Sequence, residues 1–294
     1  MPIDPNLLSV LADPADHGPL RAAGDELVNP RLGLSYPVRD GVPVLLASAA
    51  RPVAQACGTA AEGPAGPEET GSGSAASFDG VASWYDRVMQ DPGAHGPLTA
   101  LVNDLVVAEL GAGSGTVLDV ACGTGLLPRW LAPLGWTVLG LDYSADQLRI
   151  AKGRLPVVQG DAGALPVLDG VLDAVVTTFS AAPDLDAAAR EVARVLRPGG
   201  RHVAVFVHPV LNGSLSTRGE NGSVTVGAGY HDSVRLPPDQ HASTVRGRVG
   251  AVHRPLDVRL GAYLAAGLRL ERFHEVAETP QVAPTSILTA WTRN

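Results

Sequence analysis

Residues 117–125 of this 294-residue chain have the sequence VLDVACGTG. The first half is a short apolar run rich in β-branched residues, which is typical of a buried strand. The second half is a glycine turn, and the amphipathic stretch LLPRWLAPLG follows it directly. A strand, a glycine turn and a helix in this order place bare backbone N–H groups at a helix N-terminus. The stretch therefore predicts an α/β fold with a ligand-binding loop.

A second glycine-rich segment, GAGSG at residues 111–115, lies close by. It follows VVAEL, which is predicted to end a helix, and it precedes the strand instead of following it. A ligand-binding loop of an α/β protein comes after a strand and opens a helix. We therefore expect GAGSG to form only a helix C-terminal turn.

The chain from residue 78 onward alternates apolar strand-like runs with helical patterns. TVLGLD precedes SADQLRIAKGR, in which Ser144 and Gln147 have the spacing of a capping box. PVVQGD and VLDAVVTTF follow, and the predicted helix DLDAAAREVARVL is expected to stop at RPGG before the strand HVAVFV. RLERFHEV and SILTAWTR are two closing strands. This alternation predicts a parallel sheet covered by helices on both faces.

The glycine loop does not match a dinucleotide or P-loop site. Gly123 and Gly125 are present, but Pro128 occupies the third glycine position of G-x-G-x-x-G, and no G-K-[ST] follows. Asp142 ends the second strand, 17 positions after Gly125. An acidic residue at this distance is typical of a ribose ligand. A nucleoside ligand without a pyrophosphate remains.

The ordered series VLDVACGTG, GLDYS, QGDAGALP, VLDAVV and RVLRPGGR resembles the motifs of class I S-adenosylmethionine-dependent methyltransferases, over residues 78–294. The resemblance implies a Rossmann-like doubly wound seven-stranded sheet, mostly parallel with an antiparallel last strand. It also implies S-adenosyl-L-methionine as the cofactor and in-line transfer of its methyl group.

The resemblance assigns cofactor-binding roles to twelve positions. They are Asp119, Ala121, Gly123 and Gly125 for the methionine part, Asp142 for the ribose, Tyr143 for the adenine face, Asp161 and Ala162 for the adenine edge, Thr177, Thr178 and Phe179 near the amine and sulfonium, and Tyr85 in the closing segment FDGVASWYDR. Each has a simpler explanation when taken alone. Asp142 and Asp161 are also ordinary turn residues, and Tyr85 is also an ordinary core residue.

A general base is needed only when the methyl acceptor must lose a proton. His208, at the end of the fifth strand, is the first candidate for this catalytic role. Tyr230, His231 and His253 are the others, although a surface or capping role explains the two histidines better. The segment FSAAPDL after the fourth strand carries no histidine, so the acceptor type stays open.

The composition argues weakly against a nucleic-acid substrate. The chain has 22 basic and 30 acidic residues, a net charge of −8, and Lys152 is its only lysine. Two cysteines are too few for a disulfide framework or a four-thiolate zinc site, and no metal is expected. No leader or membrane span is predicted, so a soluble cytoplasmic protein without a membrane partner is the expectation.

Three parts differ in composition. We predict a small N-terminal α+β domain over residues 1–53, a flexible Gly/Pro-rich linker over residues 54–77, and a methyltransferase domain over residues 78–294. Within the last, residues 208–254 form a polar insertion expected to contact the substrate.

Residues 6–47 resemble the small zinc-ribbon-like proteins that activate methyltransferases. The positions of their zinc-binding cysteines are Asp13, Asp16, Asn29 and Leu32 here, so no thiolate remains. We expect apolar packing to hold this domain together, either as a partner fused in cis or as an inert appendage.

The leading hypothesis is a methyltransferase of small molecules. The Ala/Gly/Arg/Pro-rich composition adds the hypothesis of bacterial secondary metabolism. One alternative is an RNA or protein methyltransferase with a cis-fused activator domain. Another is a non-methylating protein of this fold, used for binding or cyclisation. The acceptor and the oligomeric state stay open.

Overall fold

The computed structural model describes residues 3–53, 78–91, 96–211, 215–219, 223–238, 245–277 and 284–294. The predicted linker, residues 54–77, lies outside these ranges. Seven strands of the larger part are paired in the order β8-β7-β6-β9-β10-β16-β15. Their bounds are β6 Thr116–Val120, β7 Thr137–Asp142, β8 Val157–Gly160, β9 Leu172–Thr178, β10 Leu196–Val207, β15 Leu268–Val276 and β16 Ser286–Arg293.

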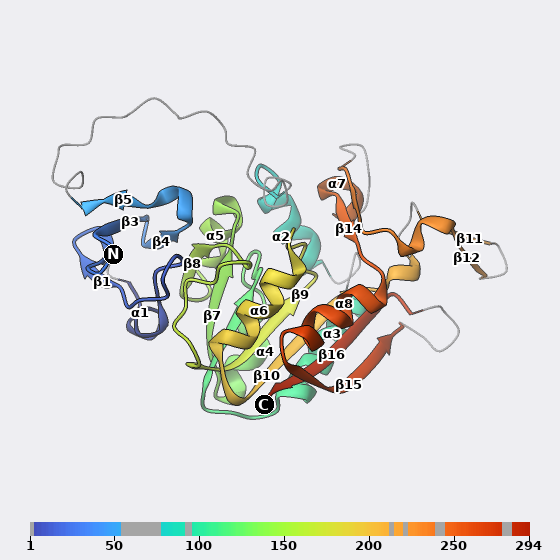
Figure 1. The fold of residues 1–294 in the computed structure, drawn as a ribbon. Coiled ribbons are helices and arrows are strands. Elements are labelled where there is room, and N and C mark those ends of the chain that lie inside the picture. Colours follow the sequence, from blue (N-terminus) through green and yellow to red (C-terminus); the bar gives the residue numbers. More distant parts are fainter. Residues whose placement is uncertain are drawn as a thin grey trace.

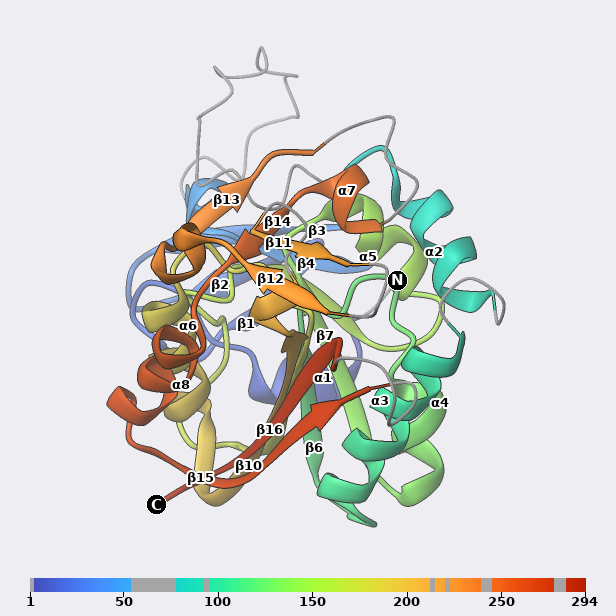
Figure 2. The ribbon, with the colours of Figure 1, turned by 90° about the vertical axis from the view of Figure 1, so that its right-hand side faces the viewer.

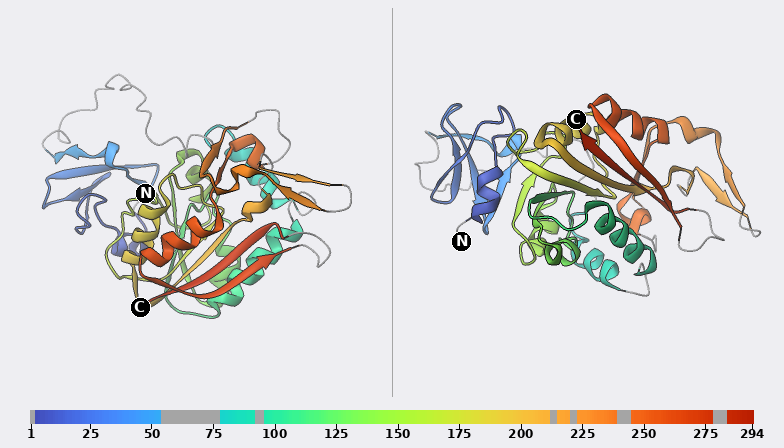
Figure 3. Two further views of the ribbon diagram at one scale, coloured as in Figure 1. Left: turned by 45° about the vertical axis from the view of Figure 1, so that its right-hand side comes forward. Right: turned by 90° about the horizontal axis from the view of Figure 1, so that it is seen from below.

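The first five of these strands run parallel, and β16 is antiparallel to both of its neighbours, β10 and β15. This confirms the predicted seven-stranded α/β sheet with an antiparallel last strand. Helices cover both faces (Figure 2; Figure 3). One face carries α3 Gly96–Leu110, α4 Pro128–Leu131 and α5 Ala145–Ala151, and the other carries α6 Leu185–Val195 and α8 Leu256–Ala265.

The short signals in the sequence explain where several helices begin and end. Ser144 caps α5 by accepting from the Gln147 N–H, and Asp184 caps α6. Gly111 has φ +66° and donates its N–H to the Val107 carbonyl at 2.8 Å. GAGSG is therefore the C-terminal turn of α3, as predicted.

The RPGG segment differs from the expectation. Helix α6 already ends at Val195, and Leu196 begins β10, so residues 197–200 lie inside the strand. The pairing of β10 with β9 shifts register between Leu196 and Arg201, which makes this stretch a bulge. Proline and glycine are tolerated there because a bulge leaves backbone groups out of the ladder.

The N-terminal elements extend the same sheet. They are α1 Pro5–Val10, β1 Arg21–Ala23, β2 Glu26–Asn29, β3 Leu34–Arg39, β4 Val42–Leu45 and β5 Arg51–Pro52. Strand β4 pairs in parallel with β8 and so joins the two parts (Figure 1). Buried Leu7, Leu11 and Leu27 belong to the same apolar cluster as α6 and α8. One core therefore spans both parts.

A polar network occupies the positions of the absent zinc ligands. The Asn29 amide donates to Asp13 Oδ2 and to Asp16 Oδ1, each at 2.9 Å. The Tyr36 hydroxyl donates to Asp13 Oδ1 at 3.0 Å, and burial followed by the charge of Asp13 raises the pKa of Tyr36. The expectation of apolar packing alone was therefore incomplete, because buried hydrogen bonds cross-link these loops.

The described residues within 208–254 form small elements around the carboxyl end of the sheet. They are η5 Pro209–Leu211, the pair β11 Ser216–Arg218 and β12 Val224–Val226, η6 Ala228–His231, the pair β13 Val234–Leu236 and β14 Ala251–His253, and α7 Val245–Val249. Figure 1 shows α7 near α2 Ala82–Gln90. In the described part of the chain, no helix has the length and apolar character needed to cross a membrane.

The network predicts a large stability effect at Asn29. Asn29→Ala would leave the buried Asp13 Oδ2 without its donor and would remove one of the two donors to Asp16 Oδ1, the other being the Gly18 N–H. We expect the free energy of unfolding to fall by about 2–4 kcal/mol, the scale for stranding buried polar or charged groups. Urea unfolding followed by circular dichroism measures this effect. Arg21→Ala, on the exposed strand β1, is the control. Equal stability of both variants would contradict the role of the network.

Candidate functional site

Strand register brings the predicted cofactor residues to one edge of the sheet. Asp119 pairs with Gly140 on β7, and Val120 pairs with Leu141 on β7 and with Thr177 on β9. The residues that follow β6, β7, β8 and β9 therefore meet at the carboxyl edge. This edge is where α/β sheets bind ligands.

Two non-glycine residues at this edge have left-handed backbone conformations. Ala121 has φ +62° directly after β6, and Phe179 has φ +56° directly after β9. Such conformations are strained for residues with a Cβ and cluster at functional sites. Gly123 and Gly125 are also left-handed, at +55° and +76°. A Cβ at Gly125 would lie 2.4 Å from Leu155 Cδ2, so only glycine lets the loop pack this closely on α5 and the turn after it.

Asp142 connects the glycine loop to the end of β7. Its Oδ2 accepts from the Gly123 N–H at 2.8 Å, and its Oδ1 accepts from the Ser144 N–H at 2.9 Å. Burial raises the pKa of Asp142 despite these hydrogen bonds. Burial, with a smaller contribution from Asp142, raises the pKa of Asp119 to about 8. The two carboxyl groups thus form an acidic pair beneath the loop.

Four buried polar atoms around this loop have no hydrogen-bond partner among the described residues. They are Asp119 Oδ1, Thr124 Oγ1, Gln147 Nε2 and Gln147 Oε1. A Cβ built on Gly123 would lie 3.8 Å from Gln147 Oε1, which places the Gln147 amide beside the loop. Unsatisfied buried groups are rare in folded proteins, and a polar ligand would satisfy them. The donors and acceptors here fit the amino, carboxylate and hydroxyl groups of S-adenosylmethionine.

Gln147 and Thr124 are residues that the sequence analysis did not assign to the site. Gln147 is the second residue of the capping box begun by Ser144, so its amide seemed committed to the helix end. In the structure the Ser144 hydroxyl accepts from the Gln147 backbone, and the side chain turns inward. The Gln147 side chain is 1% exposed, and this burial, which only the structure shows, is what marks it as a candidate site residue.

Helix α2 covers the loop from outside. The Tyr85 ring lies over Gly123, with Cε1 at 3.7 Å from the position of a Cβ there. Burial, followed by the charges of Asp142 and Asp119, raises the pKa of Tyr85 to about 12. Arg154 pairs with both oxygens of Asp86 at 2.6 and 2.9 Å and also donates to the Thr124 carbonyl. This bidentate pair holds α2 against the glycine loop.

The described part of α7 reaches the same helix. The Arg248 guanidinium lies 4.5 Å from the centre of the Trp84 ring. This cation–π contact joins the insertion to α2 above the carboxyl edge of the sheet. The exposed rings of Tyr143 and Phe179 flank the site from the ends of β7 and β9. Gln159 donates to the Tyr143 carbonyl at 2.8 Å and so fixes its backbone.

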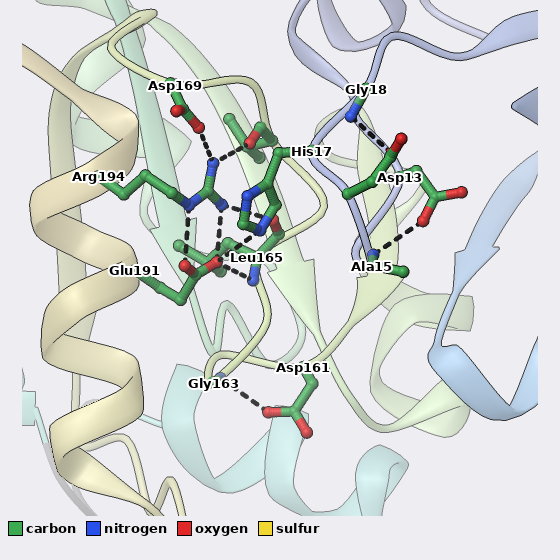
Figure 4. A network of polar contacts seen from close by, with 12 residues as sticks. Asp13, Ala15, His17, Gly18, Asp161, Gly163, Leu165, Asp169, Glu191 and Arg194 are labelled. Atoms are coloured by element: carbon green, nitrogen blue, oxygen red, sulfur yellow. Dashed lines mark hydrogen bonds and ion pairs between the residues drawn. The ribbon is translucent and has the colours of Figure 1, made fainter. Parts of the chain in front are cut away.

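The loop of Asp161 and Ala162 is held by α6 and by the N-terminal part (Figure 4). Asp161 Oδ1 accepts from the Gly163 N–H at 2.8 Å. Farther along, Arg194 donates to the carbonyls of Leu165 and Val167, and Glu191 accepts from the Leu165 N–H. His17 approaches Glu191 at 3.9 Å.

The N-terminal part also pairs with this loop through its backbone. The Ala12 N–H donates to the Pro166 carbonyl, and the Leu168 N–H donates to the Val10 carbonyl, both at 2.9 Å. The loop is therefore enclosed between two surfaces, α6 on one side and residues 10–12 on the other.

His208 is buried at the end of β10. Its Nδ1 accepts from the Val210 N–H at 3.3 Å, so Nε2 carries the proton and donates to Glu275 at 2.9 Å. Both ring nitrogens are engaged, and His208 can accept a substrate proton only if the Val210 contact opens. Its role as a general base stays a prediction.

The three other candidate groups lie together in the insertion. His253 Nε2 donates to the Tyr230 carbonyl at 2.7 Å, and the Tyr230 ring contacts the rings of His231 and His253. No group of three or more His, Cys, Asp or Glu side chains suited to a metal ion occurs among the described residues.

Comparison with protein families matches residues 118–204 to the methyltransferase domain family and residues 4–41 to the Trm112p-like protein family. The demethylmenaquinone methyltransferase of Renibacterium salmoninarum is 42% identical over 144 residues, which cover 47% of this chain and 60% of that protein. Its namesake from Mycolicibacterium paratuberculosis is 39% identical over 49% of this chain and 63% of its own length. The chain thus spans less than two thirds of each relative.

Solved structures support the fold. The S-adenosylmethionine-dependent methyltransferase of Mesorhizobium loti aligns with a TM-score of 0.55 and 22% identity, over 68% of this chain and 97% of that one. A chain of a complex that contains the Haloferax volcanii Trm112 methyltransferase activator aligns with a TM-score of 0.52 and 19% identity, over 74% and 97%. Residues 118–204 therefore match a methyltransferase domain and residues 4–41 match a Trm112p-like domain, in line with both sequence resemblances, and the solved structures share the fold.

Asp142 provides a direct test of the ribose assignment. Asp142→Ala removes two acceptors for ribose hydroxyls, and we expect binding of S-adenosylhomocysteine to weaken by about 1–3 kcal/mol. Calorimetry on the full chain measures the dissociation constant. Asp104→Ala, at an exposed position on α3, is the matched control. An unchanged constant for Asp142→Ala would show that another residue binds the ribose.

Asp119 predicts a pH dependence of stability. With a folded-state pKa of about 8 against an ordinary value of 3.8, the folded chain holds a proton that the unfolded chain has lost. The contribution of this group is fully present below about pH 4 and is lost as the pH rises toward about 8. We expect Asp119→Asn to reduce this fall in the unfolding free energy. Denaturation across pH 5–8 measures it, and an identical slope in both proteins would contradict the assignment.

Proposed function

We propose that this chain is an S-adenosylmethionine-dependent methyltransferase that acts on a small molecule. The observation that carries the proposal is the set of unsatisfied buried polar atoms of Asp119, Thr124 and Gln147 around a left-handed glycine loop. The family match of residues 118–204 and the relatives named demethylmenaquinone methyltransferase support it. Within this function, an intermediate of bacterial secondary metabolism is a possible acceptor class that the composition alone suggests.

The cofactor would supply an electrophilic methyl group on a sulfonium and its own leaving group, for an in-line displacement. The chain would then bind and orient the cofactor and the acceptor, and it would exclude water from the site. The glycine loop and Gln147 would bind the methionine part, Asp142 the ribose, and Asp161 with Ala162 the adenine edge. Tyr85 would cover the sulfonium from α2, since aromatic faces attract cations. Residues at the ends of β9 and β10 and in the insertion, residues 208–254, would align the acceptor.

The N-terminal domain has a specific place in this proposal. Through the Ala12 and Leu168 hydrogen bonds it holds the far end of the loop that begins with Asp161. We infer that it stabilises the adenine side of the cofactor site in cis. Parallel pairing of β4 with β8 and the shared core support this role, because they make the domain part of the sheet.

A specific observation favours the alternative of an RNA or protein methyltransferase. The N-terminal match is to the Trm112p-like family, and a solved complex that contains a Trm112 activator aligns with this chain. The net charge of −8 favours a small molecule over RNA.

Labelling separates these functions. The full chain is incubated with methyl-labelled cofactor and fractionated host extract, and the labelled product is identified by mass spectrometry. We expect label in a small molecule. Label in RNA or protein would overturn the substrate class. No binding of S-adenosylmethionine at millimolar concentration would overturn the methyltransferase function itself and favour a binding or cyclisation role.

The contacts of α6 with the loop that begins at Asp161 predict an effect at Arg194. Arg194→Met removes the donors to Leu165 and Val167 and the ion pair with Glu191, which keeps the Leu165 N–H as a partner. We expect the dissociation constant of S-adenosylhomocysteine to rise about tenfold, the scale of one charge-assisted hydrogen bond. Arg190→Met, exposed on the same helix, is the control. Unchanged affinity in a folded Arg194→Met variant would show that this loop does not contribute to cofactor binding.

A further inference from the structure

A small cavity lies between α6, α8 and the sheet, beside the loop that follows β9. Its volume is about 30 Å³. Val120 and Ala162, which neighbour or belong to the proposed cofactor residues, line it together with Arg254 and Arg259. Most of the remaining wall is apolar. The cavity therefore connects the cofactor edge of the sheet with two cationic side chains.

The polar groups of this cavity are all hydrogen-bond donors or hydroxyls. Besides the two guanidinium groups, Thr177, Ser180 and Tyr263 contribute hydroxyl groups, and no Asp or Glu is among the described residues that line it. Arg254 is 6% exposed and Arg259 is 9% exposed. Two buried arginines thus line one cavity, and none of its described lining residues carries a carboxylate.

Arg254 is positioned by its backbone contacts. One terminal nitrogen donates to the carbonyls of Ala182 and Pro183, at 2.5 and 2.7 Å. Its Nε and other terminal nitrogen make no hydrogen bond to the described residues, and it forms no ion pair with them. Arg259 lies with its guanidinium carbon 4.7 Å from the centre of the Phe206 ring. Both groups are therefore held in fixed orientations.

Burying a guanidinium without a counter-ion is costly. Burial lowers the pKa of Arg254, and the charge interactions with Tyr263 and with the exposed Asp184 and Asp186 offset this only in part. The rigid fork of a guanidinium matches the two oxygens of a carboxylate or phosphate. An anion from outside the chain would supply the missing charge, and the unengaged donors of Arg254 are available to it.

We propose that this cavity is a subsite for the anionic group, a carboxylate or a phosphate, of the methyl acceptor. The ligand's identity as the acceptor rests on the proposed function. A volume of about 30 Å³ is far below that of a pocket for a whole ligand, so only the charged end of a ligand enters. The rest of the acceptor then lies toward Ser180 and the ends of β9 and β10. This assigns the acceptor to the class of small organic anions.

Binding experiments on the full chain test the subsite without requiring turnover. Benzoate, its neutral analogue benzamide and inorganic phosphate are titrated by calorimetry, with and without saturating S-adenosylhomocysteine. We expect benzoate or phosphate to bind and benzamide not to bind. Preference between the two anions identifies the group as carboxylate or phosphate. Equal binding of benzoate and benzamide, or no binding of either anion, would overturn the proposal.

Variants of both arginines locate the site. We expect Arg254→Met and Arg259→Met each to raise the dissociation constant of the bound anion about tenfold or more, and Arg254→Lys to have a smaller effect because it keeps the charge. Arg254→Met also frees the carbonyls of Ala182 and Pro183, which is a structural change in itself. Arg259→Met leaves those two carbonyls bonded to Arg254 and so controls for that effect. Arg269→Met, exposed on β15, is the control. Anion affinity that is unchanged in both folded Met variants would overturn the proposal.

The cofactor titration keeps this proposal separate from the proposed function. We expect both Met variants to bind S-adenosylhomocysteine as tightly as the wild type. If they lose that affinity in parallel with the anion, the cavity serves the cofactor's own carboxylate, and the subsite proposal fails. If the wild type binds anions but no S-adenosylhomocysteine, the proposed function fails while the anion site stands.

Discussion

The hydrogen bond from the Gly123 N–H to Asp142 Oδ2 joins the ends of the two central strands, β6 and β7. It requires the glycine loop to turn back over the sheet, which Ala121, Gly123 and Gly125 achieve with left-handed backbones. The same carboxylate accepts from Ser144 and so fixes the start of α5, which carries Gln147. These hydrogen bonds therefore connect the glycine loop, helix α5 and Asp142, and helix α2 covers the loop from outside.

The N-terminal part depends on the sheet in the same way. Its last long strand, β4, adds to β8, and its apolar side chains enter the cluster beneath α6 and α8. The polar network of Asp13, Asp16 and Asn29 then replaces metal coordination by hydrogen bonds between buried groups. A domain that resembles a separate activator thus forms one edge of the same sheet.

Much of this arrangement was predictable from the sequence. The order of strand, turn and helix predicted the parallel sheet. It also identified VLDVACGTG, and not GAGSG, as the ligand-binding loop, because the position of a glycine turn relative to its strand is a local property. The place of Asp142 at the end of β7, beside the glycine loop, followed from spacing for the same reason. The partners of His208, the inward turn of Gln147 and the bulge at RPGG were not predictable, since each depends on residues distant in the chain. Glu275, which binds His208, is 67 residues away.

The sequence by itself determined the fold class, the family resemblance and the acids that face the cofactor edge, because periodicity, turn chemistry and motif spacing act over a few residues. Only the tertiary structure decided which buried polar atoms lack a partner, how the N-terminal part joins the sheet, and that Arg254 and Arg259 face one cavity. These properties depend on burial and on the pairing of strands. Both arise only when distant segments exclude water together, so no local pattern records them.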